Sequence, residues 1–409
     1  MKKSFLLLIF VTAALSAWAE GPTHQLSIKI FPLESEIRVD GVPAVPLSQE
    51  GPWKNFRVPA GEKEVTLNFS GYIAKKIPVH ADGPVKIEEK LERTGSNLKM
   101  ITELTCGKRP KSVTFSPDGD YFVVTELEGS GVGIYRRSPF GLYKHIELGG
   151  TGFVESAFIP RQNELWVSQM TTGRIHIIDT RDYSLKRSIS SGGKWTKVIS
   201  PAPSGDMVYV SNWISRDVSE IDGETGKVLR IFPVSGIPRG MAVTEDGDYL
   251  YVCIYDTGMV EKINLETGES GILPFGPGAK RHIVLDHRKK TGYVSDMYHG
   301  TVTAFSLANG RKLGEVKVGA NLNTIALSED GKFLFASVRG RNNPESYLKK
   351  GPEFGKVTVL ETDPLRIIDW TWGRNQPTGL DISPDNKYMV FSDFLDDNLE
   401  IYSIQSLWN

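Results

Sequence analysis

The sequence has only two cysteines among 409 residues and almost no net charge, with 48 basic and 49 acidic side chains. A near-neutral chain has no overall field that would draw it onto nucleic acid or an anionic membrane, so any charge preference must be local. A phosphate-binding glycine loop, a nucleophile elbow and a zinc-protease signature are also absent. The common catalytic motifs therefore indicate no activity, and nucleic-acid binding is not expected.

Long apolar runs are missing after the first twenty residues. A membrane-spanning helix needs about 20 apolar residues, so no transmembrane segment is predicted. Residues 1–19 have the pattern of a signal peptide, with Lys2 and Lys3 first, an apolar core next and Ala17-Trp18-Ala19 as the cleavage site. We expect an exported monomer, periplasmic or extracellular.

What the sequence does contain is a repeat. A two-residue apolar or aromatic step, followed by a small and mostly hydroxylic residue, occurs seven times. The central residues of these triplets are Val124, Val167, Val210, Val252, Val294, Ala336 and Phe391. The first five intervals are 43, 43, 42, 42 and 42 residues, and the sixth is 55. A period near 40 made of strand-forming segments predicts one four-stranded sheet per repeat, and therefore a seven-bladed β-propeller.

The ends of this repeat predict how the ring closes. The last repeat stops at Asn409 with no room for a fourth strand, whereas residues 99–104 form an alternating strand that belongs to no blade. We expect strand 99–104 to close the last blade of a propeller spanning residues 98–409, because closure removes an exposed sheet edge. Cys106 and Cys253 then fall in blades on opposite sides of the ring, too far apart for a disulfide.

Residues 25–92 precede the repeat and do not share it. Short alternating segments separated by Gly and Pro turns, such as Leu26 to Ile30 and Val65 to Phe69, predict a small antiparallel β-sandwich. The predicted fold class is thus all-β, a seven-bladed β-propeller preceded by a small sandwich.

Two family resemblances accompany these patterns. Val39-Asp40-Gly41, Pro59-Ala60-Gly61 and Gly71-Tyr72 resemble the PEGA domain of bacterial envelope proteins, although Pro32-Leu33-Glu34-Ser35 stands in place of the P-E-G-A tetrad. Tyr209 to Asn212, followed by Glu220-Ile221-Asp222, resembles the YVTN-repeat propellers. The first resemblance implies an adaptor to the cell surface. The second implies an extracytoplasmic binding protein, with lactonases or lyases among related propellers.

The candidate ligand site is the mouth of the propeller channel. Aligning the repeats places one residue per blade at the start of the inner strand, and four of the seven are cations, which would focus a positive potential. The alternative is that these cations form solvent-exposed ion pairs, Lys111 with Glu126 and Arg281 with Asp296. Such pairs contribute little to the stability of the fold. The predicted ligand-binding residues are Lys111, Lys197, Arg239, Arg281, His282, Asn323, Trp213, Tyr255 and Tyr298.

A divalent cation is the alternative occupant. Glu155, Asn212 and Asp296 offer oxygen ligands of the kind that Ca²⁺ and Mg²⁺ prefer, although nearby cations would repel the ion. His282 beside Arg281, with Glu155 across the mouth, is the only candidate base. Catalytic residues are otherwise unidentified, and no cofactor is required.

Two functions remain open from the sequence. The first is a non-catalytic envelope protein whose propeller binds an anionic small molecule, a glycan or a peptide at the channel mouth. The alternative is a metal-dependent lactonase or lyase of the gluconolactonase-like propeller type, for which Glu155 would be a metal ligand.

Overall fold

The computed structural model describes residues 22–409, so the predicted signal peptide lies outside the described residues. The chain divides into two compact units, of which the first holds the described residues up to Ser96 together with Pro352–Phe354, and the second holds the rest. No helix of the described part is both long and apolar enough to cross a membrane.

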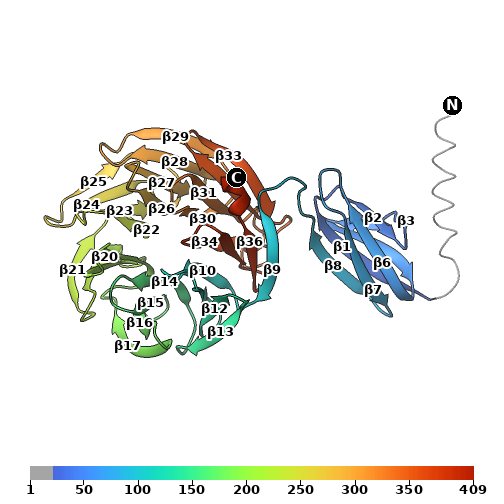
Figure 1. Cartoon of the computed structure of the whole chain (residues 1–409), viewed down its shortest axis with the longest axis horizontal. Coiled ribbons are helices and arrows are strands. Elements are labelled where there is room, and N and C mark those ends of the chain that lie inside the picture. Colours follow the sequence, from blue (N-terminus) through green and yellow to red (C-terminus); the bar gives the residue numbers. More distant parts are fainter. Residues whose placement is uncertain (1–21) are drawn as a thin grey trace. The chain divides into compact units, whose positions relative to one another are not determined.

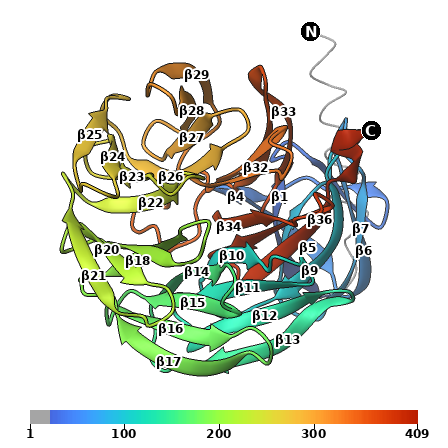
Figure 2. The same cartoon turned by 60° about the vertical axis from the view of Figure 1, so that its left-hand side comes forward.

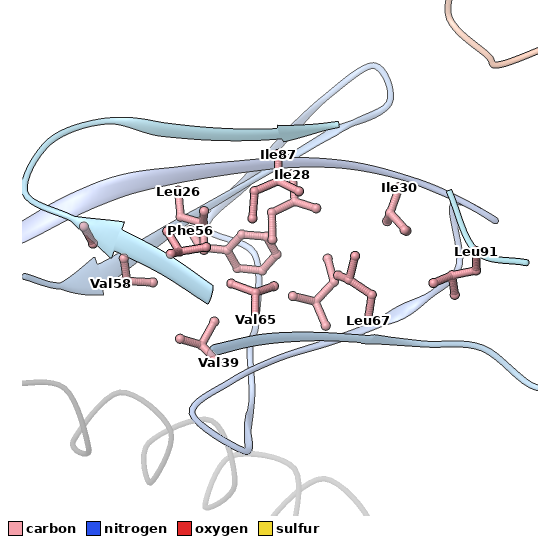
Figure 3. Close-up of a cluster of buried hydrophobic side chains, with 13 residues drawn as sticks. Leu26, Ile28, Ile30, Val39, Phe56, Val58, Val65, Leu67, Ile87 and Leu91 are labelled. Carbon is pink, nitrogen blue, oxygen red and sulfur yellow. The ribbon is translucent and has the colours of Figure 1, made fainter. Parts of the chain in front are cut away.

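The first unit consists of two four-stranded sheets, ordered β4-β5-β1-β8 and β3-β2-β6-β7. Their strands are β1 (Thr23–Phe31), β2 (Glu36–Val39), β3 (Val42–Pro43), β4 (Ser48–Glu50), β5 (Trp53–Pro59), β6 (Gly61–Asn68), β7 (Lys75–Ala81) and β8 (Val85–Lys90). Alternating apolar residues such as Ile28, Phe56 and Val65 point between the sheets and form the core (Figure 3). The sandwich is predominantly antiparallel as predicted, except that β1 and β8 pair in parallel.

The second unit contains seven four-stranded sheets arranged around a centre, the β-propeller that the repeat predicts (Figures 1 and 2). The innermost strands are β10 (Pro110–Phe115), β14 (Phe153–Ile159), β18 (Thr196–Pro201), β22 (Pro238–Val243), β26 (Lys280–Asp286), β30 (Leu322–Leu327) and β34 (Pro377–Ile382). The second strands, which carry the triplets, are β11 (Tyr121–Glu126), β15 (Glu164–Gln169), β19 (Met207–Asn212), β23 (Tyr249–Ile254), β27 (Thr291–Asp296), β31 (Phe333–Val338) and β35 (Tyr388–Asp393).

Two further strands complete each blade. The third strands are β12 (Gly131–Arg137), β16 (Arg174–Asp179), β20 (Asp217–Asp222), β24 (Val260–Asn264), β28 (Thr301–Ser306), β32 (Lys356–Thr362) and β36 (Asn398–Ser403). The outer strands are β13 (Phe140–Glu147), β17 (Ser184–Ser190), β21 (Val228–Pro233), β25 (Ser270–Leu273), β29 (Lys312–Lys317), β33 (Leu365–Trp372) and β9 (Lys99–Thr105). A short 3₁₀ helix, η1 (Gln405–Trp408), follows the last strand.

The seventh blade is composed of both ends of the repeat region. β9 pairs antiparallel with β36, so a strand that precedes the first blade supplies the outer strand of the last one. Apolar side chains of neighbouring blades pack face to face, as Trp166 and Ile177 of the second blade do with Ile199 and Val210 of the third. Since one sheet cannot bury both of its faces alone, this packing makes the ring the stable unit.

Candidate functional site

The hydroxyl of the repeated triplet explains how the inner strands present their side chains. Each inner strand has a register shift near its start. In six blades the triplet hydroxyl accepts the backbone N–H at that shift, for example from His282 to Ser295 at 3.1 Å. Several of these hydroxyls also donate to the next blade, as Ser295 does to the carbonyl of Asn323 at 2.9 Å. The triplet thus fixes the bulge and links neighbouring blades.

A second backbone contact recurs in all seven blades. The carbonyl of the residue just before each inner strand accepts the N–H of the residue just after the second strand, as Trp195 does from Trp213 at 3.0 Å. The residues held in this way are Leu127, Met170, Trp213, Tyr255, Met297, Arg339 and Phe394. Together with the residues at the start of the inner strands, they form two rings of side chains at one end of the channel.

The two rings enclose a cavity of about 430 Å³. Its lining residues are Lys111, Leu127, Val154, Met170, Trp195, Lys197, Trp213, Arg239, Tyr255, Arg281, Met297, Arg339, Asn342 and Tyr347. Three of them, Arg339, Asn342 and Tyr347, come from the long segment between β31 and β32, residues 339–355, which we call the sixth-blade insertion. Most of the lining is aromatic, aliphatic or cationic, a composition suited to a small anionic ligand with an apolar face.

Five cations line this cavity: Lys111, Lys197, Arg239, Arg281 and Arg339, which we call the mouth cations. The last four are between 4% and 8% exposed. Among the described residues none of the five forms an ion pair, and Nε of both Arg239 and Arg281 is buried without a hydrogen-bond acceptor. Burying a charge without a counter-charge is costly, so this arrangement is typical of a binding site rather than of a structural core.

The contacts that the mouth cations do make are mostly with aromatic rings. Lys197 Nζ lies 3.5 Å from the ring centroid of Trp213, and the Arg239 guanidinium is 5.1 Å from the same ring. Lys111 Nζ lies 4.9 Å from the Phe394 centroid. Cation–π contacts stabilise a cation without neutralising it. The positive charge of the cavity is therefore still available to a ligand.

Burial and mutual repulsion act on the ionisation of this cluster. Burial, followed by the charges of neighbouring arginines, holds the pKa values of Lys111 and Lys197 well below their usual range. Burial also lowers the pKa of Arg281, with Arg239 adding to the effect. An anion in the cavity would reverse the repulsive part of these shifts, so ligand binding and lysine protonation are coupled.

A second cavity of about 340 Å³ continues along the channel and is lined by residues further along the inner strands, including Glu155, His282 and Asp381. Burial raises the pKa of Glu155, although Arg281 and Arg239 oppose the shift. Burial and Arg281 lower the pKa of His282 to about 3, which leaves its imidazole neutral near pH 7. Burial raises the pKa of Asp381 to about 6, while that carboxylate accepts the backbone N–H groups of Phe115 and Ile382.

Most of the predicted ligand residues line one or the other cavity. Lys111, Lys197, Arg239, Arg281, Trp213 and Tyr255 line the mouth, whereas His282 lines the cavity beneath. Asn323 lines neither; it is fully buried and its Nδ2 has no acceptor.

Tyr298 departs from the prediction, because its side chain is 77% exposed and lies outside the cavity lining. Met297, one residue earlier, holds the ring position, since the N–H that meets the carbonyl of Ala279 belongs to Met297.

The surface ion pairs weighed from the sequence are replaced by others. Asp296 does not pair with Arg281; its Oδ2 lies 2.6 Å from Nζ of the neighbouring Lys280, and both side chains are buried. Glu126 meets His145 at 3.1 Å instead of Lys111. The mouth cations therefore do not form ion pairs with the acidic residues Glu126 and Asp296 at the ends of the second strands.

The predicted metal ligands do not offer free oxygen atoms at one place. Asn212 Oδ1 accepts from the Thr196 hydroxyl at 3.0 Å, while its amide donates to Asp217 and Ser219. Asp296 is occupied by Lys280 and His299, and although burial opposes it, the Lys280 contact lowers its pKa to about 2. Across residues 22–409 no group of three or more His, Cys, Asp or Glu side chains is placed to hold a metal ion.

Asn212 and Asp296 instead have a structural role that the sequence hides. A Cβ placed on Gly193 would lie 2.2 Å from Cγ of Asn212, and one on Gly278 would lie 2.1 Å from Oδ2 of Asp296. The polar side chain at the end of the second strand thus fills the space beside the glycine that precedes the inner strand. We call Asn212 and Asp296 the loop anchors.

The predicted set of ligand-binding residues leaves out two side chains that shape the mouth, although the sixth-blade insertion, which begins at Arg339, was expected to contribute to this surface. Arg339 follows the second strand of the sixth blade, and its Nε donates to the Thr378 hydroxyl at 3.0 Å. Trp195 precedes an inner strand and stacks parallel to Trp213, with ring centroids 6.2 Å apart. Each lies directly beside a strand end: Arg339 is the first residue after a second strand, and Trp195 is the last residue before an inner strand. The importance of these two positions follows from the backbone hydrogen bond that joins them in every blade.

Comparisons with known proteins agree with this fold. The family model described as "Lactonase, 7-bladed beta-propeller" matches residues 271–407, which include Arg281 and Arg339 but not Lys111, Lys197 or Arg239. Antigen Lp49 of Leptospira interrogans is 37% identical over 360 residues, covering 83% of this chain and 78% of that protein. A 6-phosphogluconolactonase of Formosa agariphila is 26% identical over 259 residues, covering 54% of this chain and 70% of that protein.

Solved propellers show the same fold at low identity. The hydrazine synthase of Kuenenia stuttgartiensis superposes with a TM-score of 0.63 at 18% identity, covering 72% of this chain and 95% of that chain. The Cps50 (Swd1) β-propeller domain of Myceliophteria thermophila also gives a TM-score of 0.63, at 12% identity, covering 75% of this chain and 99% of that domain. At these identities the likeness concerns the fold alone.

Proposed function

The chain belongs to the seven-bladed β-propeller family that includes antigen Lp49 of Leptospira interrogans, and from this premise we propose that its channel mouth binds an anionic lactone and hydrolyses it. The observation that carries the proposal is the set of five mouth cations, four of them buried, which form no ion pair among the described residues. The lactonase family model and the 6-phosphogluconolactonase relative supply the reaction class.

The mouth cations would hold the anionic group of the substrate and stabilise charge that develops on the lactone carbonyl oxygen. Arg281 and Arg239 suit this role because their guanidinium groups are buried and donate in a fixed planar geometry. Preorganised donors in a water-poor cavity are effective because they need no reorganisation during the reaction.

Glu155 is the residue we assign to proton transfer. It would accept a proton from a water molecule whose oxygen adds to the lactone carbonyl carbon; the ring C–O bond then breaks, and the ring oxygen takes up the proton. Its pKa, raised by burial, makes the carboxylate a stronger base than an exposed glutamate. His282, neutral near pH 7, could not serve as a charged acid there.

Hydrolysis converts an uncharged ester into a carboxylate, so the product carries one more negative charge than the substrate. A cavity with five cations should bind the product more tightly than the substrate. Strong product inhibition is therefore part of the proposal.

The second candidate is non-catalytic binding of the same class of anion. It is favoured by one observation: no carboxylate or histidine is among the described residues that line the mouth, and Glu155 lines the cavity beneath it. The comparisons lend it no support. A metal-dependent reaction is not proposed, because the oxygen atoms of Asn212 and Asp296 already have protein partners.

The test uses the full chain with glucono-δ-lactone and its 6-phosphorylated form as substrates, and acid release as the readout. We expect faster hydrolysis of the phosphorylated lactone, loss of hydrolysis in Glu155→Gln, and an increased KM in the Lys197→Ala, Arg239→Ala, Arg281→Ala triple variant. Binding of 6-phosphogluconate without hydrolysis of either lactone would select the non-catalytic candidate. Absence of any thermal shift with 6-phosphogluconate or inorganic phosphate at millimolar concentration would refute both.

We also propose export to the periplasm or beyond, on the sequence pattern of residues 1–19. Fractionation of cells that express the full chain, followed by N-terminal sequencing, tests this proposal. An intact N-terminus on a cytoplasmic product would refute it.

A further inference from the structure

A strained backbone position recurs at the channel mouth. The residue just before the inner strand has a left-handed backbone in five of the seven blades. These residues are Arg109, Gly152, Trp195, Asn321 and Gln376, at φ values of 57, 97, 59, 55 and 64°. Gly and Asn adopt this conformation readily, whereas a bulky side chain does so at a cost of about 1–2 kcal/mol. Trp195 therefore occupies a position where the fold itself prefers a small residue.

The other large residues at this position have local partners that offset the strain. Arg109 Nη2 donates to the carbonyl of Leu348 at 3.2 Å, and Gln376 Nε2 donates to the carbonyl of Tyr347 at 2.7 Å. Both contacts hold the sixth-blade insertion in place. Trp195 has no such side-chain hydrogen bond among the described residues: the residue is 40% exposed, and the one aromatic ring stacked on its indole is that of Trp213. Backbone strain that no local hydrogen bond offsets is typical of functional positions.

The surroundings of Trp195 indicate what it meets. It lines the mouth cavity beside Lys197 and Arg239, which lie over the ring of Trp213. Nε1 of Trp213 is buried and has no acceptor among the described residues. A flat aromatic wall thus adjoins two unpaired cations and an unused N–H donor. That combination accepts a ring stacked on the indole and joined to an anionic group.

We infer that Trp195 and Trp213 form a stacking subsite for a sugar ring, and that the ligand is an acidic oligosaccharide with its charged unit in the mouth and its next unit on Trp195. The inference rests on the proposed binding of an anionic sugar derivative by the mouth cations. A sugar needs only a flat apolar surface for its C–H face, whereas a nucleobase also needs partners for the polar atoms on its edge. Trp195 has no polar side-chain contact, which favours the sugar.

Calorimetric titration of the full chain with galacturonic acid and with trigalacturonic acid tests this inference. The trimer should bind about tenfold more tightly than the monomer, as expected for one added stacking contact. In Trp195→Asn the trimer should lose that advantage and bind no more tightly than the monomer. The variant should fold at least as stably as the parent, because Asn321 already occupies the same left-handed position in the sixth blade. Tyr298→Asn, which removes an exposed aromatic outside the cavity lining, is the matched control and should change neither affinity.

Equal affinities for monomer and trimer in the parent chain, or an unchanged trimer affinity in Trp195→Asn, would overturn the inference while leaving anion binding at the mouth intact. Trp195-dependent binding of AMP in preference to trigalacturonic acid would replace the sugar by a nucleotide. If neither sugar acid, phosphate nor 6-phosphogluconate binds, the proposed function fails and the stacking subsite fails with it.

Discussion

Two sets of polar side chains lie at the same end of the propeller, and they differ in how they are satisfied. The loop anchors Asn212 and Asp296 have protein partners for their oxygen atoms, and Asp296 forms a buried pair with Lys280. Four of the five mouth cations, all but Lys111, are also buried, and none of the five forms an ion pair among the described residues. Lys280 and Arg281 are consecutive in sequence, yet one has a carboxylate and the other lacks one. Burial alone therefore does not mark a functional residue; burial without a partner does.

The largest expected effect comes from breaking the anchored pair. Asp296→Ala leaves the Lys280 ammonium buried without a counter-charge, so we expect a loss of about 3–5 kcal/mol in the free energy of unfolding, measured by urea denaturation. Lys280→Met should also destabilise, but by less, because His299 and two backbone N–H groups still contact the carboxylate. A loss below about 1 kcal/mol in both variants would mean that the pair is not an anchor.

The matching change among the mouth cations should have the opposite sign. Lys197→Met removes a buried charge that forms no ion pair among the described residues. The methionine side chain can still pack on the ring of Trp213. We expect the free energy of unfolding to rise by about 1 kcal/mol or more while the affinity for 6-phosphogluconate falls. Destabilisation by Lys197→Met to the extent seen for Lys280→Met would remove the distinction between the two sets.

The two sets should also differ in their response to pH. The pKa values of Lys111 and Lys197 are lowered in the folded chain by burial and neighbouring cations, and return to about 10.4 on unfolding. Between the lowered values and about 10.4 the unfolded chain binds more protons, so these lysines make stability rise with pH in that window; the benefit is lost as pH falls through the lowered values.

The measurement is the difference in unfolding free energy between the parent and a Lys111→Met, Lys197→Met double variant across that window. The advantage of the variant should shrink as the pH rises toward about 10.4. Binding of 6-phosphogluconate should take up protons, which calorimetry in buffers of different ionisation enthalpy detects. A pH-independent difference and no proton uptake would contradict the coupling.

The sequence predicted the ring well because its signal is repeated. The seven triplets report the second strands, and each hydroxyl has the same task of bonding the bulge of the inner strand, so the blade count and the fold class are confirmed. The likeness to YVTN and PEGA proteins stays a prediction. Periodicity also located Lys111, Lys197, Arg239 and Arg281, since each is the second residue of its inner strand.

The rest of the site could not be predicted because it depends on a single-residue register and on partners. Whether Met297 or Tyr298 lines the mouth depends on which of the two backbone N–H groups donates to the carbonyl of Ala279. Whether Asp296 is a metal ligand or an anchor depends on Lys280, the first residue of β26 and two positions after Gly278. The functional meaning of Trp195 lies in its φ of 59°, which has no signature in composition or spacing.

The smallest expected effect tests whether the triplet hydroxyl is general. In the fourth blade its place is held by Cys253, which is fully buried and has a free thiol. By homology with the other six blades, a hydroxyl there would face the backbone N–H of Gly240. Cys253→Ser should therefore change the free energy of unfolding by no more than about 0.5–1.5 kcal/mol in the stabilising direction, the value of one added hydrogen bond. Ser295→Ala in the fifth blade is the matched control and should destabilise, since it leaves the bonds to His282 and Asn323 unmade. Marked destabilisation by Cys253→Ser would show that the bulge of the fourth blade has a different geometry, which does not accommodate this hydrogen bond. The orientation of Arg239 could then not be explained by the bond that fixes the other inner strands.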